Sequence, residues 1–212
     1  MAVRGIGAKP LSERGKIEVR TVKPWEEPGL TRAGRVIAFL EDLPITAGSL
    51  AGTTMKIRPW QRQFLEDVYA EDETGRRPVR TAVLSMGRKN GKTQLAAGLA
   101  LCHLMGPEAE PRGEVYSAAL TRDQAAKLFQ EMTAILQAHP ELDDRANVIR
   151  HSKQVEVLFG DGAGSIYAAL SADAGSKMGL SPSFVGYDEL GSAPNRDLFD
   201  ALDTATGARD LA

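Results

Sequence analysis

The nine residues SMGRKNGKT, Ser85 to Thr93, are the part of this sequence that most restricts its fold. They begin at the last residue of a short apolar run, VRTAVLS at 79–85, and extend into an alanine- and leucine-rich segment at 91–105. Length and composition predict a buried strand before the turn and a helix packed on both sides after it. A strand, a glycine-containing turn and a helix in this order predict an anion site, because helix N-termini present free N–H groups.

The turn is close to the phosphate-loop pattern G-x-x-x-x-G-K-[ST], except that Met86 stands where the first glycine belongs. Gly87, one residue later, still gives the turn conformational freedom. Gly91 would let the backbone approach a phosphate, Lys92 would neutralise the β- and γ-phosphates, and the Thr93 hydroxyl would bind Mg²⁺. A chance Gly-Lys-Thr is the alternative, so a second, independent part of the site is needed.

An acidic pair supplies that second part. Asp188 and Glu189 end the apolar run SFVGY at 183–187, which predicts a strand. Asp188 would support Mg²⁺ and Glu189 would activate the attacking water, although a polar strand end is common in any protein. Two parts in the right order, each closing an apolar strand, favour a nucleotide site.

Three further residues belong to the candidate loop, and we expect residues 87–93 together to hold triphosphate and Mg²⁺. Arg88 is near enough to the γ-phosphate position to stabilise transition-state charge, or else it faces solvent. Lys89 is expected to be an exposed neighbour, and Asn90 completes the loop.

The rest of the chain predicts an α/β fold with three layers. A helix starts after Thr31, another covers 58–69, a strand covers 114–120, and Thr121 with Gln124 forms a capping box for a long helix. Alternation around FGDGAGS predicts a β-hairpin over 154–169, and Asn195 caps a last helix. Strands alternating with helices imply a mostly parallel central sheet with helices on both faces.

Composition excludes several classes. The net charge of −2 argues against a strong global attraction to nucleic acid, although residues 1–35 carry eight Lys/Arg against four Asp/Glu. This basic segment is either a solvated arm or a nucleic-acid contact.

The single cysteine, Cys102, excludes an internal disulfide and is expected in the core rather than as a nucleophile. His103, His139 and His151 lack metal-ligand spacing. No apolar stretch is long enough for a membrane span, and the start lacks a signal peptide, so we expect a soluble, intracellular protein.

The arrangement of motifs resembles the large terminase subunits of tailed double-stranded DNA phages, especially the branch with HK97-type capsids. Trp60 and Gln61 lead a segment similar to the family's adenine-side Q motif, and Gln61 would read the adenine edge with Trp60 packing behind it. The resemblance covers about 55–207 in order, through four segments: RPWQRQFLEDVY, GRKNGKT, VYSAALTRDQAAKLF and SADAGSKMGLSPSFVGYDELGSAPNRDLFDAL.

The resemblance implies a P-loop ATPase domain of the ASCE, RecA-like type over residues 55–212. Residues 1–54 match the family only loosely, and their composition predicts an extended arm over 1–30. We therefore expect a basic N-terminal arm and a lead-in helix over 1–54. The resemblance also implies ATP and Mg²⁺ as cofactors, double-stranded DNA as substrate, and a homo-oligomeric ring at the procapsid portal in the bacterial cytoplasm. The small terminase subunit and the portal protein are the implied partners. Lys177 is the candidate for a trans-acting cation at the γ-phosphate, against a simple exposed lysine.

The same resemblance leaves parts of the family pattern outside this chain. A C-terminal nuclease domain and a coupling motif are expected beyond Ala212, so the fold is expected to be C-terminally truncated and without endonuclease activity. TATG at 204–207 resembles the coupling motif only superficially, since it is expected to be a helix end. Two other functions remain open: a helicase-like, nucleic-acid-dependent ATPase, and a truncated, non-catalytic remnant that binds nucleotide or DNA.

Overall fold

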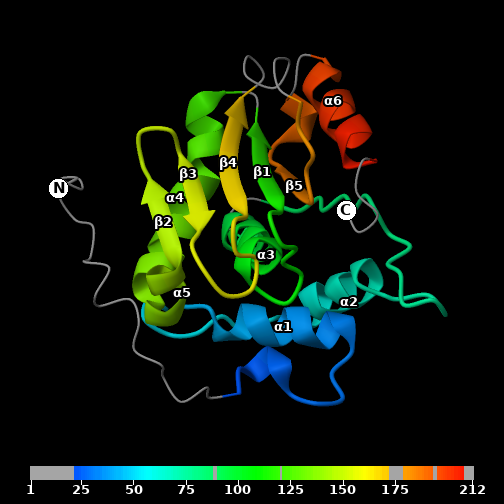
Figure 1. The fold of residues 1–212 in the computed structure, drawn as a ribbon, viewed down its shortest axis with the longest axis vertical. Coiled ribbons are helices and arrows are strands. Elements are labelled where there is room, and N and C mark those ends of the chain that lie inside the picture. Colours follow the sequence, from blue (N-terminus) through cyan, green and yellow to red (C-terminus); the bar gives the residue numbers. More distant parts are fainter. Residues whose placement is uncertain (1–21, 88–89, 120, 172–178, 193–194, 208–212) are drawn as a thin grey trace.

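A computed structural model of the chain describes residues 22–87, 90–119, 121–171, 179–192 and 195–207 (Figure 1). The helices are α1 (Arg32–Asp42), α2 (Pro59–Val68), α3 (Lys92–Met105), α4 (Arg122–Ala138), α5 (Pro140–Arg145) and α6 (Asp197–Thr206), with 3₁₀ turns at Pro24–Glu26 and Leu190–Ser192. The strands are β1 (Glu114–Ala119), β2 (Ala146–Ile149), β3 (Gln154–Val157), β4 (Ile166–Ser171) and β5 (Phe184–Tyr187).

The five strands form one sheet in the order β2-β3-β4-β1-β5. β1 lies between β4 and β5 and pairs with both in parallel, while β3 pairs antiparallel with β2 and β4. β3 is therefore the one described strand that runs against the others, which confirms a mostly parallel sheet. The β3–β4 pair is the hairpin that the sequence predicts over 154–169.

Helices cover both faces of the sheet, which confirms the three layers. On one face α3 and α4 pack over Val115 and Tyr167 in the main core. On the other face Tyr116 and Leu170 pack with Leu198 and Leu202 of α6. Figure 1 shows α6 beside β5, and α1 and α2 below the sheet. Neighbouring residues of β1 point to opposite faces because side chains alternate along a strand.

The segment before the loop is where the sequence prediction is wrong. Residues 79–85 form no strand, and Val83 is 80% exposed, although Leu84 packs against the core. Apolar composition favours a strand only if a neighbouring strand accepts its backbone hydrogen bonds. Among the described ladders none includes 79–85, so this segment approaches the loop as irregular chain.

Residues 1–30 were expected to be an extended arm, and part of that expectation is also wrong. Residues 1–21 lie outside the described part, but Pro24–Glu26 form a 3₁₀ turn whose Trp25 is 4% exposed. The Trp25 ring packs edge-on against Phe39 of α1, with ring centroids 4.9 Å apart. Because α1 shares its core with α3, burial is continuous across residue 54. The residues before and after position 54 thus share one core, and the division into two parts at residue 54 stays a prediction.

The predicted helix signals are borne out at several ends. The Thr31 side chain accepts a hydrogen bond from the Gly34 N–H, and Thr121 with Gln124 forms the predicted capping box of α4. The last helix begins two residues after Asn195, whose side chain still accepts the Asp197 N–H. In the described residues no helix combines the length and apolarity that a membrane crossing requires.

Candidate functional site

The candidate loop enters α3 through a glycine in a left-handed conformation. Gly91 has φ 76° and ψ 19°, which a residue with a side chain adopts only with strain, and its carbonyl accepts the first helical bond from Leu95 at 3.0 Å. Lys92 is the first residue of the helix and Thr93 follows it in an exposed position. The free N–H groups of this first turn and the Lys92 ammonium together favour a bound anion.

Two side chains fold back onto the loop. The Lys92 Nζ donates to the Met86 carbonyl at 3.1 Å, and the Asn90 Nδ2 donates to the Gly87 carbonyl at 3.2 Å. Both bonds use neutral acceptors, which an oxyanion can replace with stronger charge-assisted bonds. The donors present therefore suit a phosphate group. Arg88, Lys89 and Lys177 lie outside the described residues, so their roles stay predictions.

The acidic pair lies at the carboxyl end of β5. The Asp188 N–H donates to the Ala118 carbonyl at 2.9 Å, which extends the β1–β5 ladder by one bond and fixes the Asp188 backbone. Glu189 then turns sharply, with φ 53°, a left-handed conformation that is rare for a residue with a side chain. Such backbone conformations cluster at functional sites.

A residue that sequence reasoning used only as a helix cap contacts this pair. Gln124 Nε2 donates to Glu189 Oε2 at 3.2 Å. β1 and β5 are parallel neighbours, so the segments that follow them leave the sheet at the same edge, and α4 begins there. The signal that could have identified Gln124 is its place in the first turn of a helix that follows a strand next to β5.

The structure does not join the two halves of the site by direct contacts. Within the described residues, neither Lys92 nor Thr93 forms a hydrogen bond or ion pair with Asp188 or Glu189. Nor does any group of three or more His, Cys, Asp or Glu side chains there lie close enough to hold a metal ion. A magnesium site at Thr93 and Asp188 therefore stays a prediction, carried by oxygen ligands of the type that Mg²⁺ prefers.

The two residues expected at the adenine side differ in exposure. Trp60 is 38% exposed, whereas Gln61 is 7% exposed and its Oε1 accepts the Arg58 N–H at 2.8 Å as the cap of α2. Trp60 therefore presents the more accessible surface to a base, and the Gln61 carbonyl oxygen is already bonded. Their roles in adenine binding stay predictions.

Other reactive side chains are buried in the core. Cys102 is fully buried and burial raises the pKa of its thiol, which confirms the expectation of a core residue. Burial lowers the pKa of His103 well below its usual value, and its Nε2 lies 2.9 Å from the Tyr69 hydroxyl. His103 also stacks on Phe184 with ring centroids 4.4 Å apart. These contacts connect α3 to α2 and β5 as packing groups.

In sequence and in structure, the chain is similar to large terminase subunits. Residues 59–210 match the family model described as the terminase large subunit, ATPase domain. The large terminase subunit of Enterobacteria phage HK97 is 39% identical over 184 residues, which are 85% of this chain and 35% of that protein. The crystal structure of the HK97 bacteriophage large terminase matches with a TM-score of 0.73 and 36% identity over 86% of this chain and 36% of that one. The chain thus spans well under half the length of these relatives.

Proposed function

We propose that this chain, which belongs to the terminase large-subunit ATPase domain family, is the ATP-hydrolysing part of a motor that moves double-stranded DNA into a phage procapsid. The observation that supports this best is the pair of features inside the matched region. Gly91 and Lys92 open a helix with free N–H groups, and Asp188 and Glu189 close a parallel strand at its carboxyl end.

Each residue has a distinct role in the proposal. The loop from Gly87 to Thr93 binds the triphosphate, with Lys92 against the β- and γ-phosphates and Arg88 stabilising charge at the γ-phosphate. Thr93 and Asp188 would hold Mg²⁺, which supplies positive charge to the phosphates when bound. Glu189 orients the attacking water and takes its proton at the carboxylate.

The larger assembly is also a proposal, since the chain spans 35% of its HK97 relative. We infer double-stranded DNA as the polymer moved, a homo-oligomeric ring, contacts with the portal protein and small terminase subunit, and a site of action in the host cytoplasm. Lys177 is the proposed cation that one subunit offers to its neighbour's γ-phosphate.

A thermal shift with Mg²⁺-ATP tests the binding half of the proposal. At about 100 times the dissociation constant, ATP adds about 2.7 kcal/mol of stability. For a chain of this size that is a rise in Tm of roughly 5–10 °C. We expect the rise in wild type and in Lys127→Ala, an exposed lysine of α4, but not in Lys92→Ala. A rise that persists in Lys92→Ala would contradict the assignment of the loop.

Phosphate release tests the catalytic half. Glu189→Gln should abolish hydrolysis and keep the ATP-dependent rise in Tm, because the amide keeps the shape but cannot take a proton. Glu66→Gln makes the same chemical change at an exposed position of α2 and should hydrolyse ATP like wild type. Binding without hydrolysis in wild type would favour a non-catalytic nucleotide-binding module instead.

A further inference from the structure

Gln124 contacts the proposed catalytic carboxylate from a different helix. Its side-chain Nε2 donates to Glu189 Oε2 at 3.2 Å, and the two residues are 65 positions apart in the chain. Glu189 is exposed and follows the end of β5 on a left-handed backbone, so its side chain has few packing neighbours to select one rotamer. The amide of Gln124 is therefore a specific restraint on an otherwise weakly held carboxylate.

The orientation of that amide is itself fixed. Gln124 Oε1 accepts from the Thr121 N–H at 3.2 Å and from the Thr121 hydroxyl at 3.3 Å, while the Thr121 hydroxyl accepts the Gln124 N–H at 3.2 Å. These bonds form the capping box at the start of α4. With its oxygen held by Thr121, the amide presents its NH₂ group to Glu189, so the donor direction follows from the helix cap.

We propose that Gln124 is a positioning residue, whose side-chain amide is oriented by the Thr121 cap and fixes the Glu189 carboxylate at the carboxyl edge of the sheet. This inference rests on the proposed role of Glu189 in ATP hydrolysis. It links the start of α4 to the water-activating group, so a shift of that helix end would move the carboxylate. Gln124 itself touches neither nucleotide nor water in this proposal.

The substitution Gln124→Glu tests the hydrogen bond to Glu189 separately from the hydrogen bond to Thr121. Glutamate keeps the acceptor for the Thr121 N–H and is favourable in the first turn of a helix, so the cap and the fold should persist. The donor to Glu189 is replaced by a second carboxylate, which repels it. Gln130→Glu makes the identical change six residues further along the same helix at an exposed position and is the matched control.

The kinetic readout is the split between kcat and KM for ATP. Misplacing a catalytic group by about 1 Å can cost up to roughly 100-fold in rate, so we expect kcat in Gln124→Glu to fall by about 10- to 100-fold. KM for ATP and the ATP-dependent rise in Tm should stay within about twofold and a few degrees, because binding of the phosphates uses the loop before α3. Gln130→Glu should match wild type. Equal kcat in all three proteins would overturn the inference.

A second readout does not depend on turnover. The side-chain NH₂ resonances of Gln124 in a ¹⁵N-labelled chain should shift in Glu189→Ala, because their acceptor is removed, and should stay in place in Glu66→Ala. Gln124 side-chain resonances that do not shift in Glu189→Ala would overturn the inference even if wild type hydrolyses ATP. Absence of hydrolysis in wild type would instead count against the proposed function, and the NMR result would still decide whether Gln124 holds Glu189.

Discussion

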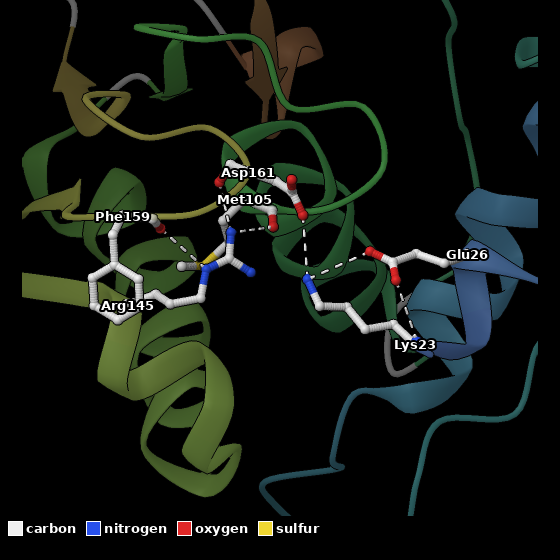
Figure 2. Close-up of polar contacts among 6 residues, drawn as sticks. All are labelled: Lys23, Glu26, Met105, Arg145, Phe159 and Asp161. Atoms are coloured by element: carbon white, nitrogen blue, oxygen red, sulfur yellow. Dashed lines mark hydrogen bonds and ion pairs between the residues drawn. The ribbon is translucent and has the colours of Figure 1, made fainter. Parts of the chain in front are cut away.

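Arg145 allows the sharpest stability prediction. It is the last residue of α5 and is 7% exposed, and its guanidinium donates to three backbone carbonyls (Figure 2). These are the carbonyls of Met105 at 3.1 Å, Phe159 at 3.3 Å and Asp161 at 2.6 Å. The side chain therefore joins the end of α3 to the loop between β3 and β4. Burial lowers the pKa of Arg145, but a guanidinium stays charged at neutral pH.

Arg145→Met keeps the apolar stem and removes the donors. The bond to Met105 is fully buried, so losing it costs about 1.5–3 kcal/mol, the range for a hydrogen bond to a charged group. The Phe159 and Asp161 carbonyls are partly exposed, so water can replace part of each bond at a cost of about 1 kcal/mol apiece. The sum is about 3.5–5 kcal/mol, which lowers Tm by roughly 7–20 °C.

Urea unfolding followed by circular dichroism measures this difference, with an unchanged m-value as the check on two-state comparison. Asp161→Asn is the control at the same loop: it removes the 3.2 Å ion pair with Lys23 but keeps the carbonyl that Arg145 uses. Its cost should be below about 1 kcal/mol, because the Asp161 side chain is 53% exposed. A cost below about 1 kcal/mol for Arg145→Met would refute the reasoning, since desolvation of the charge would then cancel the three bonds.

Three further predictions concern the core around α3. Gly98→Ala should destabilise the chain by about 1–3 kcal/mol in urea despite the better helix propensity of alanine, because an added Cβ would lie 2.6 Å from Leu40 Cδ2. Because burial lowers the pKa of His103, the unfolded chain binds a proton that the folded chain does not. Stability should therefore fall by up to about 1.4 kcal/mol per pH unit below the usual pKa of 6.5, and His103→Gln should remove that slope in urea titrations at several pH values. Cys102 should react with a thiol reagent much faster in denaturant than in the folded chain, and equally fast labelling of the native chain would contradict its burial.

Features that depend on local chemistry were predictable from the sequence. The capping box of α4 is an example, because Thr121 and Gln124 satisfy the helix end without help from distant residues. The helix after the loop and the strands β1 and β5 also follow from short runs of apolar residues. Family membership depended on the order of such motifs, which explains why it was recognisable without a structure.

Features that depend on which β-strands pair with each other were not predictable from local sequence. β2 is only four residues long and follows α5 directly, so Ala146–Ile149 carry too little periodicity to identify a strand. It forms because β3 offers it an antiparallel partner. The contact of Gln124 with Glu189 was not predicted for a related reason. It requires β1 and β5 to be neighbours, and the sequence of neither strand specifies the strand order of the sheet.

The segment 79–85 shows that strand pairing also affects the candidate site. Its composition predicts a strand, and a strand in the sheet would have placed the loop and the acidic pair by backbone ladders alone. In the described part of the chain it joins no ladder, so α3 is held instead by side-chain packing against α1, α4 and the sheet. Glu189 follows β5 and accepts a hydrogen bond from Gln124, whereas Lys92 is the first residue of the packed helix α3. The geometry between the proposed nucleotide loop and the Glu189 carboxylate is therefore set by how α3 packs on the sheet, and not by the loop sequence itself.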